Sequence, residues 1–191
     1  QPAPGATMIL VVHDTNADAV RRGYEPWLRE TDCPFFNAVP GVAYYASWKV
    51  DAAAPFAYFA FMVLDAPDSL PDVWFDPDVD RFRNERIRLW GNGEAPLAMH
   101  RYGHVTRTAR ANAGIETDSG WLSLGCGDVP AELPTAFTVE GSLADHFAGS
   151  EEPRLAPVTI RNPFGFDWVG FSRERPAAGD LVLPCHAVAR P

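Results

Sequence analysis

Histidine and tyrosine residues near the ends of neighbouring predicted strands are the residues best suited to chemistry in this sequence. Of the five histidines, His13 closes the first predicted strand and His100 lies near the start of the fourth. Antiparallel pairing would bring both to one end of a sheet, where Tyr58 and Trp48 lie on the other two strands. Histidine titrates near neutral pH, and a tyrosine hydroxyl can donate to a developing oxyanion. We therefore expect proton transfer on a phenolic or carbonyl substrate, with His13 or His100 as the base and Tyr58 at the oxyanion.

A second group of candidates lies in the stretch HRYGH at residues 100–104. Side chains alternate along a strand, so His100, Tyr102 and His104 would share one face. Tyr102 is an alternative oxyanion donor, and His104 is a further catalytic candidate. The two histidines of this stretch would stand about 13 Å apart, which is too far for one metal ion. We expect no metal; a site built from His13, Asp14 and His100 is the metal-binding alternative.

Substrate contacts are expected from aromatic side chains on the second predicted strand and from a turn late in the chain. One face of that strand would pack in the core, and the other would line the pocket. The segment RNPFGFDW, residues 161–168, is typical of a turn between strands. As an aromatic lid it would also offer an arginine to grip a substrate carboxylate. The expected substrate-binding residues are Tyr44, Tyr45, Trp48, Arg161, Phe164 and Phe166.

Two other residues offer chemistry of a different kind. His146, on a short predicted helix, is a conceivable proximal haem ligand, although a lone helical histidine is usually just exposed. Cys33 would be a nucleophile only beside a base or a positive charge, and none is near it in the sequence, so a small buried residue is the simpler interpretation. We therefore expect no cofactor, with haem or a metal ion as alternatives.

The elements that must position these residues follow a β-α-β-β-α-β order, which is the ferredoxin-like plan. Apolar and β-branched runs predict the strands, and apolar residues spaced three and four apart predict the helices. The Pro-Gly pair at residues 40–41 ends the first helix abruptly. The second helix begins at the capping residue Asp76 and can end at Gly91. The four predicted strands cover residues 8–13, 42–50, 56–64 and 97–105.

The segment GYEPWLRETDCPFFNAVPGVAYYASWKV, residues 23–50, resembles the first helix and second strand of the dimeric α/β-barrel superfamily, especially its EthD-like and related small-molecule enzymes. The resemblance covers roughly residues 8–106. Many relatives carry a histidine just before the proline that matches Pro34, where this chain has Thr-Asp-Cys, so a mechanism that needs this histidine does not carry over. The matching positions are Tyr24, Trp27, Leu28, Pro34, Val39, Pro40, Gly41 and Val42.

The resemblance implies a homodimer in which two ferredoxin-like sheets face each other and close a barrel, with the active site inside it. It also implies chemistry on aromatic or polyketide-like substrates, since the superfamily includes cofactor-free oxygenases, isomerases, cyclases and lyases, and also haem enzymes. The expected fold class is accordingly α+β, a ferredoxin-like βαββαβ unit forming a dimeric α/β barrel, with a β-rich C-terminal extension.

The chain divides into three parts on this reading. Residues 1–7 are a flexible leader, residues 8–106 form the α/β-barrel domain, and residues 107–191 form the β-rich extension. A degenerate second ferredoxin-like half is the alternative for the last part. Short β-like runs in it cover residues 121–126, 136–140, 158–161, 166–171 and 181–188.

Composition excludes several classes of function. A formal charge of −9 and a pI near 4.9 argue against nucleic-acid partners and anionic membrane surfaces. Three widely spaced cysteines are no disulfide framework and favour a reducing cytoplasm. We expect a cytoplasmic, cofactor-independent enzyme of lyase, cyclase, isomerase or dehydratase type, acting on a small aromatic substrate. A cofactor-free or haem-dependent oxygenase and a non-catalytic module that binds a hydrophobic ligand are the alternatives.

Overall fold

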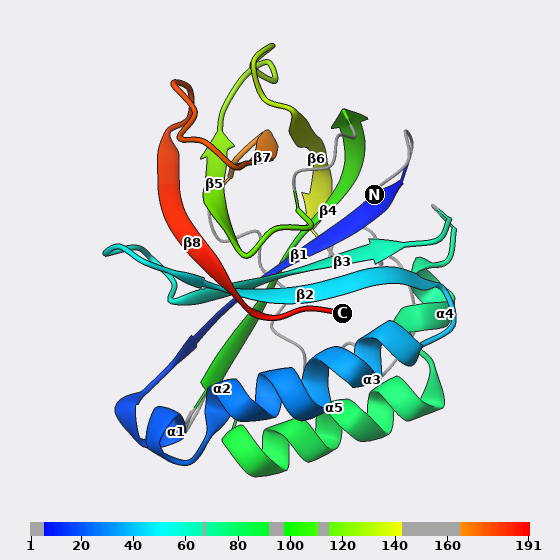
Figure 1. Ribbon diagram of the computed structural model, residues 1–191. Coiled ribbons are helices and arrows are strands. Elements are labelled where there is room, and N and C mark those ends of the chain that lie inside the picture. The colour runs from blue at the N-terminus through cyan, green and yellow to red at the C-terminus, as the bar shows by residue number, and fades with distance from the viewer. Residues whose placement is uncertain (1–5, 67, 92–97, 111–114, 143–164) are drawn as a thin grey trace.

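Eight antiparallel strands close into one barrel within a single chain (Figure 1). The computed structural model describes residues 6–66, 68–91, 98–110, 115–142 and 165–191. Around the barrel the strands follow the order β1-β3-β2-β8-β5-β7-β6-β4. Because the last strand pairs with the first, the barrel has no free edge. The strands are β1 Thr7–Thr15, β2 Val42–Val50, β3 Tyr58–Leu64, β4 Ala98–Arg110, β5 Ser119–Gly125, β6 Thr135–Ser142, β7 Trp168–Ser172 and β8 Leu181–Ala189.

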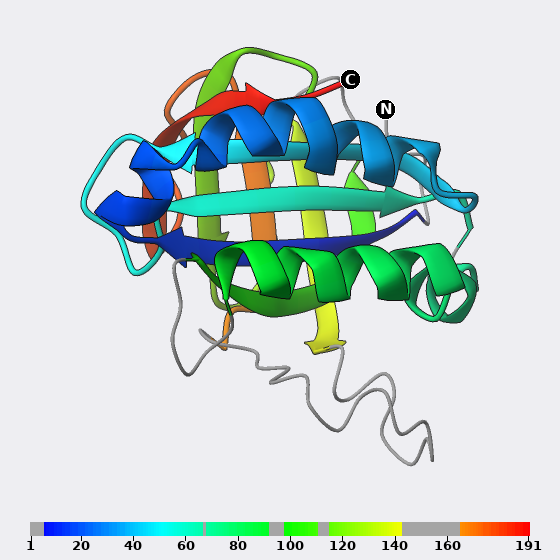
Figure 2. The same ribbon diagram turned by 90° about the horizontal axis from the view of Figure 1, so that it is seen from below.

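Helices cover the outer face of β1, β3 and β2 (Figure 2). The segment between β1 and β2 runs along β2, and the segment between β3 and β4 runs along β1. No helix in the described part of the chain is both long and apolar enough to cross a membrane. The helices are α1 Ala17–Arg21, α2 Tyr24–Trp27, the π-helical η1 Leu28–Asp32, α3 Cys33–Ala38, α4 Leu70–Trp74 and α5 Pro77–Trp90.

A π-helical turn lies in the middle of the helical run that precedes β2. The Cys33 amide donates to the carbonyl of Leu28, five residues back. Pro34 follows immediately and has no amide hydrogen to give to the ordinary α-helical ladder, so the wider turn accommodates it. This turn places Asp32 at its end, facing the sheet and fully buried.

The predicted end of the first helical run and the predicted start of the second helix are both confirmed. The helical run ends at Ala38, and Gly41 adopts a φ of +91° before β2 begins. A Cβ atom on Gly41 would lie 2.8 Å from Val73, so the turn also needs glycine for the close approach of α4. Asp76 caps α5 by accepting from the amides of Asp78 and Val79.

The predicted fold class is wrong, and so is the description of the chain as a ferredoxin-like half of a dimeric α/β barrel. β2 pairs with β8 and β4 pairs with β6, so the edges at which a ferredoxin-like sheet would end are occupied. Strands β5 to β8 are therefore half of the barrel and not an extension beside it. Closing this barrel requires no second copy of the chain. The local runs that predict these strands carry no information on which distant strands pair with them.

Two separate cores result from the alternation of side chains along β1, β2 and β3. Inward-facing residues fill the barrel interior, the cluster that includes Leu10, Trp48 and Phe61. Outward-facing residues pack against the helices in what we call the helix–sheet layer, which includes Ile9, Tyr45 and Met62 from the strands and further side chains from the helices. The buried polar side chains of His13, Asp32 and Arg86 lie in or beside this layer.

Candidate functional site

The predicted cluster of His13, Tyr58 and Trp48 is divided by the sheet. His13 on β1 is directly opposite Tyr58 on β3, and their rings stack with centroids 5.2 Å apart in the helix–sheet layer. Trp48 is opposite Phe59, so it faces the barrel interior and packs against Phe171. The structure thus brings the histidine and the tyrosine together but places the tryptophan on the other side of the sheet.

His13 is buried and electrically neutral at physiological pH. Its Nδ1 lies 2.8 Å from the hydroxyl of Tyr24 on α2. Burial, together with the positive charge of Arg86, lowers the pKa of the imidazole to about 3. An imidazole with so low a pKa is a weak proton acceptor near pH 7, which argues against His13 as the main base.

The remaining predicted catalytic residues lie on β4. The backbone register places His100 opposite His13 and Tyr102 opposite Val11. The side chains of residues 98–105, including that of His104, are outside the described part of the structure. Arg161, Phe164 and His146 also lie outside the described residues.

The predicted substrate-binding aromatics of β2 take different places. Tyr44 packs against the barrel interior, and its hydroxyl donates to the carbonyl of Ile115 at 3.3 Å. Tyr45 faces the helix–sheet layer, and its hydroxyl donates to a carboxylate oxygen of Asp32 at 2.7 Å. Phe166 is partly buried against the barrel interior. Of these aromatic residues, Tyr45 is the one that reaches a group able to transfer a proton.

Asp32 is the candidate that sequence reasoning missed. Its side chain is buried, and its Oδ1 atom has no hydrogen-bond partner among the described residues. Burial raises the pKa of this carboxyl to about 6, and the Arg86 charge and the Tyr45 hydroxyl only partly oppose the shift. A signal was present in the sequence, because Leu28, Asp32 and Phe36 follow one another at helical spacing on one buried face.

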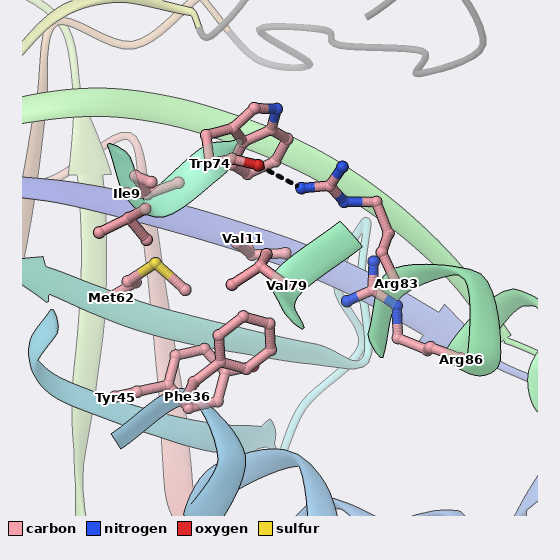
Figure 3. Close-up of a pocket in the computed structure, with 10 residues that line it drawn as sticks. Ile9, Val11, Phe36, Tyr45, Met62, Trp74, Val79, Arg83 and Arg86 are labelled. Atoms are coloured by element: carbon pink, nitrogen blue, oxygen red, sulfur yellow. Dashed lines mark hydrogen bonds between the residues drawn. The ribbon is translucent and has the colours of Figure 1, made fainter. Parts of the chain in front are cut away.

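A pocket opens between this part of the sheet and the helices (Figure 3). Tyr45 and Arg86, both of which interact with Asp32, line it. Its free volume is about 20 Å³, which is room for a water-sized occupant. The other lining residues are Ile9, Val11, Phe36, Met62, Val73, Trp74, Val79 and Arg83.

The comparisons with known proteins give no family. No protein-family profile, no curated protein and no solved structure matches this chain.

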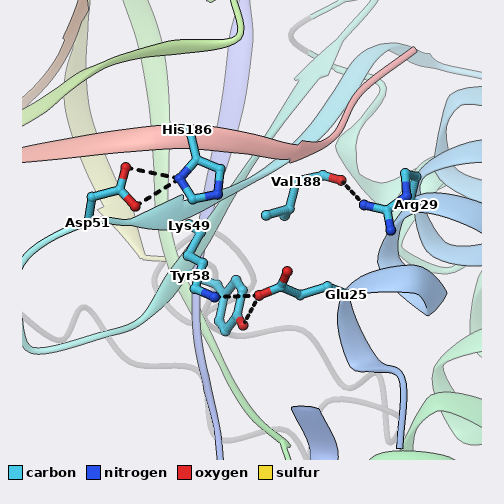
Figure 4. Close-up of polar contacts among 7 residues, drawn as sticks. All are labelled: Glu25, Arg29, Lys49, Asp51, Tyr58, His186 and Val188. Carbon is cyan, nitrogen blue, oxygen red and sulfur yellow. Dashed lines mark hydrogen bonds and ion pairs between the residues drawn. The ribbon is translucent and has the colours of Figure 1, made fainter. Parts of the chain in front are cut away.

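Polar contacts continue from the buried layer to the surface beside α2 (Figure 4). The Tyr58 hydroxyl donates to Glu25 Oε1 at 2.8 Å, and the ammonium of Lys49 lies 2.6 Å from the same oxygen. Partial burial acts to raise the pKa of Glu25, but the hydrogen bonds from Lys49 and Tyr58 outweigh it and hold that pKa below its usual value. Burial and the bond to Glu25 raise the pKa of Tyr58. Its proton is directed at Glu25, so the predicted oxyanion role of Tyr58 would require this bond to break.

A second surface pair lies next to this group. His186 on β8 is the cross-strand neighbour of Lys49, and its Nδ1 lies 2.8 Å from Asp51 (Figure 4). Both side chains are roughly half exposed. Neither residue is among those that line the pocket of the helix–sheet layer.

The metal and thiol alternatives find little support in the geometry. Asp14 follows His13 directly, so their side chains leave opposite faces of β1, and Asp14 accepts from the amide of Ala57. Among the described residues no group of three His, Cys, Asp or Glu side chains is placed to bind a metal. Burial and the neighbouring Asp32 raise the pKa of Cys33 to about 11, so its thiol stays protonated and is a poor nucleophile.

Proposed function

We propose that this protein is an enzyme that transfers a proton on a small, largely apolar carbonyl compound, with Asp32 as the proton-transfer group. The observation that carries the proposal is a buried carboxyl, one oxygen of which is held by Tyr45 while the other lacks a partner among the described residues. Two residues that interact with Asp32, Tyr45 and Arg86, line the pocket. Strongly shifted pKa values beside a pocket are typical of catalytic carboxyls.

The electrostatics of Asp32 suit general acid–base chemistry. A pKa of about 6 lets the carboxylate accept a proton and give it back near neutral pH. The Tyr45 hydrogen bond fixes the orientation of the carboxyl group. The guanidinium of Arg86 is placed to stabilise negative charge in the same region, because it is buried and therefore poorly screened by water.

The proposed step starts with the ionised carboxylate of Asp32. It takes a proton from the carbon next to the substrate carbonyl, the electron pair of that C–H bond moves toward the carbonyl oxygen, and an enolate forms beside Arg86. The proton then returns to the same carbon or to another one. Lyase, cyclase, isomerase and dehydratase reactions can all begin in this way, and the proposal extends only to this shared step.

Substrate size follows from the pocket. A free volume of about 20 Å³ accepts no aromatic or polyketide-like molecule unless the lining side chains move. Small carbonyl compounds demand the least movement, and we commit to these. The lining is otherwise apolar and aromatic, with Val11, Phe36 and Met62 among its residues. Such a lining excludes water from the reacting carbon and strengthens the charges of the site.

Deuterium exchange tests the proposal without knowledge of the natural reaction. We expect the protein to accelerate incorporation of deuterium from D2O into at least one of a panel of small ketones and β-dicarbonyl compounds, followed by proton NMR. Asp32→Asn should lower the rate by about 100-fold or more, which is typical for loss of a general base. Asp72→Asn, which changes an exposed acid on α4, is the matched control and should leave the rate unchanged.

Circular dichroism should show that both variants fold. Exchange by Asp32→Asn as fast as by the unchanged protein would contradict the proposal, and so would a protein that accelerates exchange on no member of the panel.

A further inference from the structure

One oxygen of the Asp32 carboxyl is buried without a hydrogen-bond partner among the described residues. This atom is Oδ1, and the residue as a whole is 1% exposed. The other oxygen, Oδ2, accepts from the Tyr45 hydroxyl at 2.7 Å. Withdrawing a carboxyl oxygen from bulk water without a new partner costs free energy, and ordered waters commonly satisfy such buried groups. Oδ1 therefore needs a small hydrogen-bonding partner that the described side chains do not supply.

The pocket between the sheet and the helices has the size and the position to hold such a partner (Figure 3). Its free volume of about 20 Å³ exceeds the roughly 10–15 Å³ that one water requires, and it accepts nothing larger unless the lining moves. Three of the lining residues are neighbours of Asp32. Phe36 follows it by one helical turn on the same buried face, Tyr45 holds Oδ2, and the charge of Arg86 acts on the carboxyl.

We infer that the pocket binds one water molecule, which donates a hydrogen bond to Oδ1 of the ionised Asp32 carboxyl. The second hydrogen of this water is directed at the hydroxyl oxygen of Tyr45, which lines the pocket. That oxygen keeps acceptor capacity, because its own hydrogen points to Oδ2. Two polar partners are the minimum for a buried water, and the site needs no donor from Arg83 or Arg86. The inference does not rest on the proposed function, since a bound water would satisfy Oδ1 in a protein of any activity.

A high-resolution crystal structure of the unchanged protein tests the inference directly. We expect one ordered water in the pocket, within about 3 Å of Asp32 Oδ1 and of the Tyr45 hydroxyl oxygen. In solution, water-selective NOE spectra should show a cross-peak between a long-lived water and the methyl protons of Val11 or Met62, which line the pocket.

Filling the pocket should displace the water and change the titration of Asp32. Val79→Ile adds one methyl group to a residue that lines the pocket. The midpoint of the Asp32 titration should rise by about one pH unit relative to the unchanged protein, because the ionised carboxylate loses a donor. Val188→Ile is the matched control. It adds the same methyl group in the helix–sheet layer, at a residue that does not line the pocket, and should leave the midpoint unchanged.

Three outcomes would overturn the inference. These are a pocket without an ordered water, a water in the pocket that makes no hydrogen bond to Asp32, and a midpoint that rises no more in Val79→Ile than in Val188→Ile. The ordered water without deuterium exchange would refute the proposed function alone. Deuterium exchange without the ordered water would refute this inference alone.

Discussion

The barrel interior and the helix–sheet layer are built from alternate residues of the same strands, yet they differ in chemistry. The interior is closely packed with aliphatic and aromatic side chains such as Leu10, Phe59 and Phe61. The layer on the other face of the sheet contains the buried polar side chains of His13, Asp32 and Arg86. It also holds the pocket.

Under the proposed function, the site of this closed barrel lies outside the barrel, between the sheet and the helices. The interior of this eight-stranded barrel is filled by its own side chains. In this chain the helices supply a second surface against the sheet, and groups that strands alone could not place next to one another meet there. Asp32 comes from the π-helical turn, Tyr45 from β2 and Arg86 from α5.

The largest expected effect comes from truncation in the barrel interior. Phe61 is fully buried and contacts the rings of Phe59 and Phe171. Phe61→Ala should lower the free energy of unfolding by about 3–5 kcal/mol, because it removes buried apolar surface and leaves a cavity. Urea denaturation measures this loss.

The same substitution should leave the pKa of Asp32 in the folded protein unchanged. A loss below about 1 kcal/mol, or a clear change at Asp32, would show that the two regions are not independent.

Replacing Asp32 in the helix–sheet layer should have a smaller effect, and it should raise the free energy of unfolding. The pKa of Asp32 is about 6 in the folded protein and near 3.8 in the unfolded chain. Between pH 3.8 and pH 6 the folded state therefore binds more protons than the unfolded state. The contribution of Asp32 to stability is therefore most favourable below about pH 4 and is lost as the pH rises through 6. Asp32→Asn should stabilise the protein by about 3 kcal/mol at pH 8. It should change stability little at pH 4.

Thermal or urea denaturation across this pH range measures the difference between the variant and the unchanged protein. The lowered pKa of His13 has the opposite effect on the pH dependence, because it makes stability fall as the pH drops below 6.5. This contribution is the same in both proteins, so the difference between them removes it. Asp72→Asn should show no such trend. Destabilisation by Asp32→Asn at pH 8 would mean that the carboxylate is needed as the partner of Arg86 and that its pKa is not raised.

Local features of the fold could be predicted from the sequence. The Pro-Gly turn at residues 40–41 and the Asp76 cap are found as expected, because proline, glycine and a capping carboxylate act through their own backbone geometry. The pairing of β2 with β8 could not be predicted, because it joins residues that are more than a hundred positions apart. Nothing local to either strand specifies that contact.

The site was only partly predictable for a related reason. The adjacency of His13 and Tyr58 follows from strand order and register, and it is found. The sequence also predicts Trp48 in this cluster, but Lys49 is the residue opposite Tyr58, and a shift of one residue reverses the face of a side chain. An aspartate in a helix is usually exposed, so residue type and spacing alone do not single out Asp32. Its burial depends on the sheet and on α5, which come from other parts of the chain.

The most direct test of the account is the titration of Asp32 itself. Carbon-detected NMR of protein labelled at the side-chain carboxyl carbons follows each aspartate from pH 3 to pH 8, and Asp32→Asn assigns the resonance. We predict a midpoint near 6 for Asp32. A midpoint at or below the ordinary value of 3.8 would mean that this carboxyl is a permanently ionised partner of Arg86, and it would contradict a role in proton transfer.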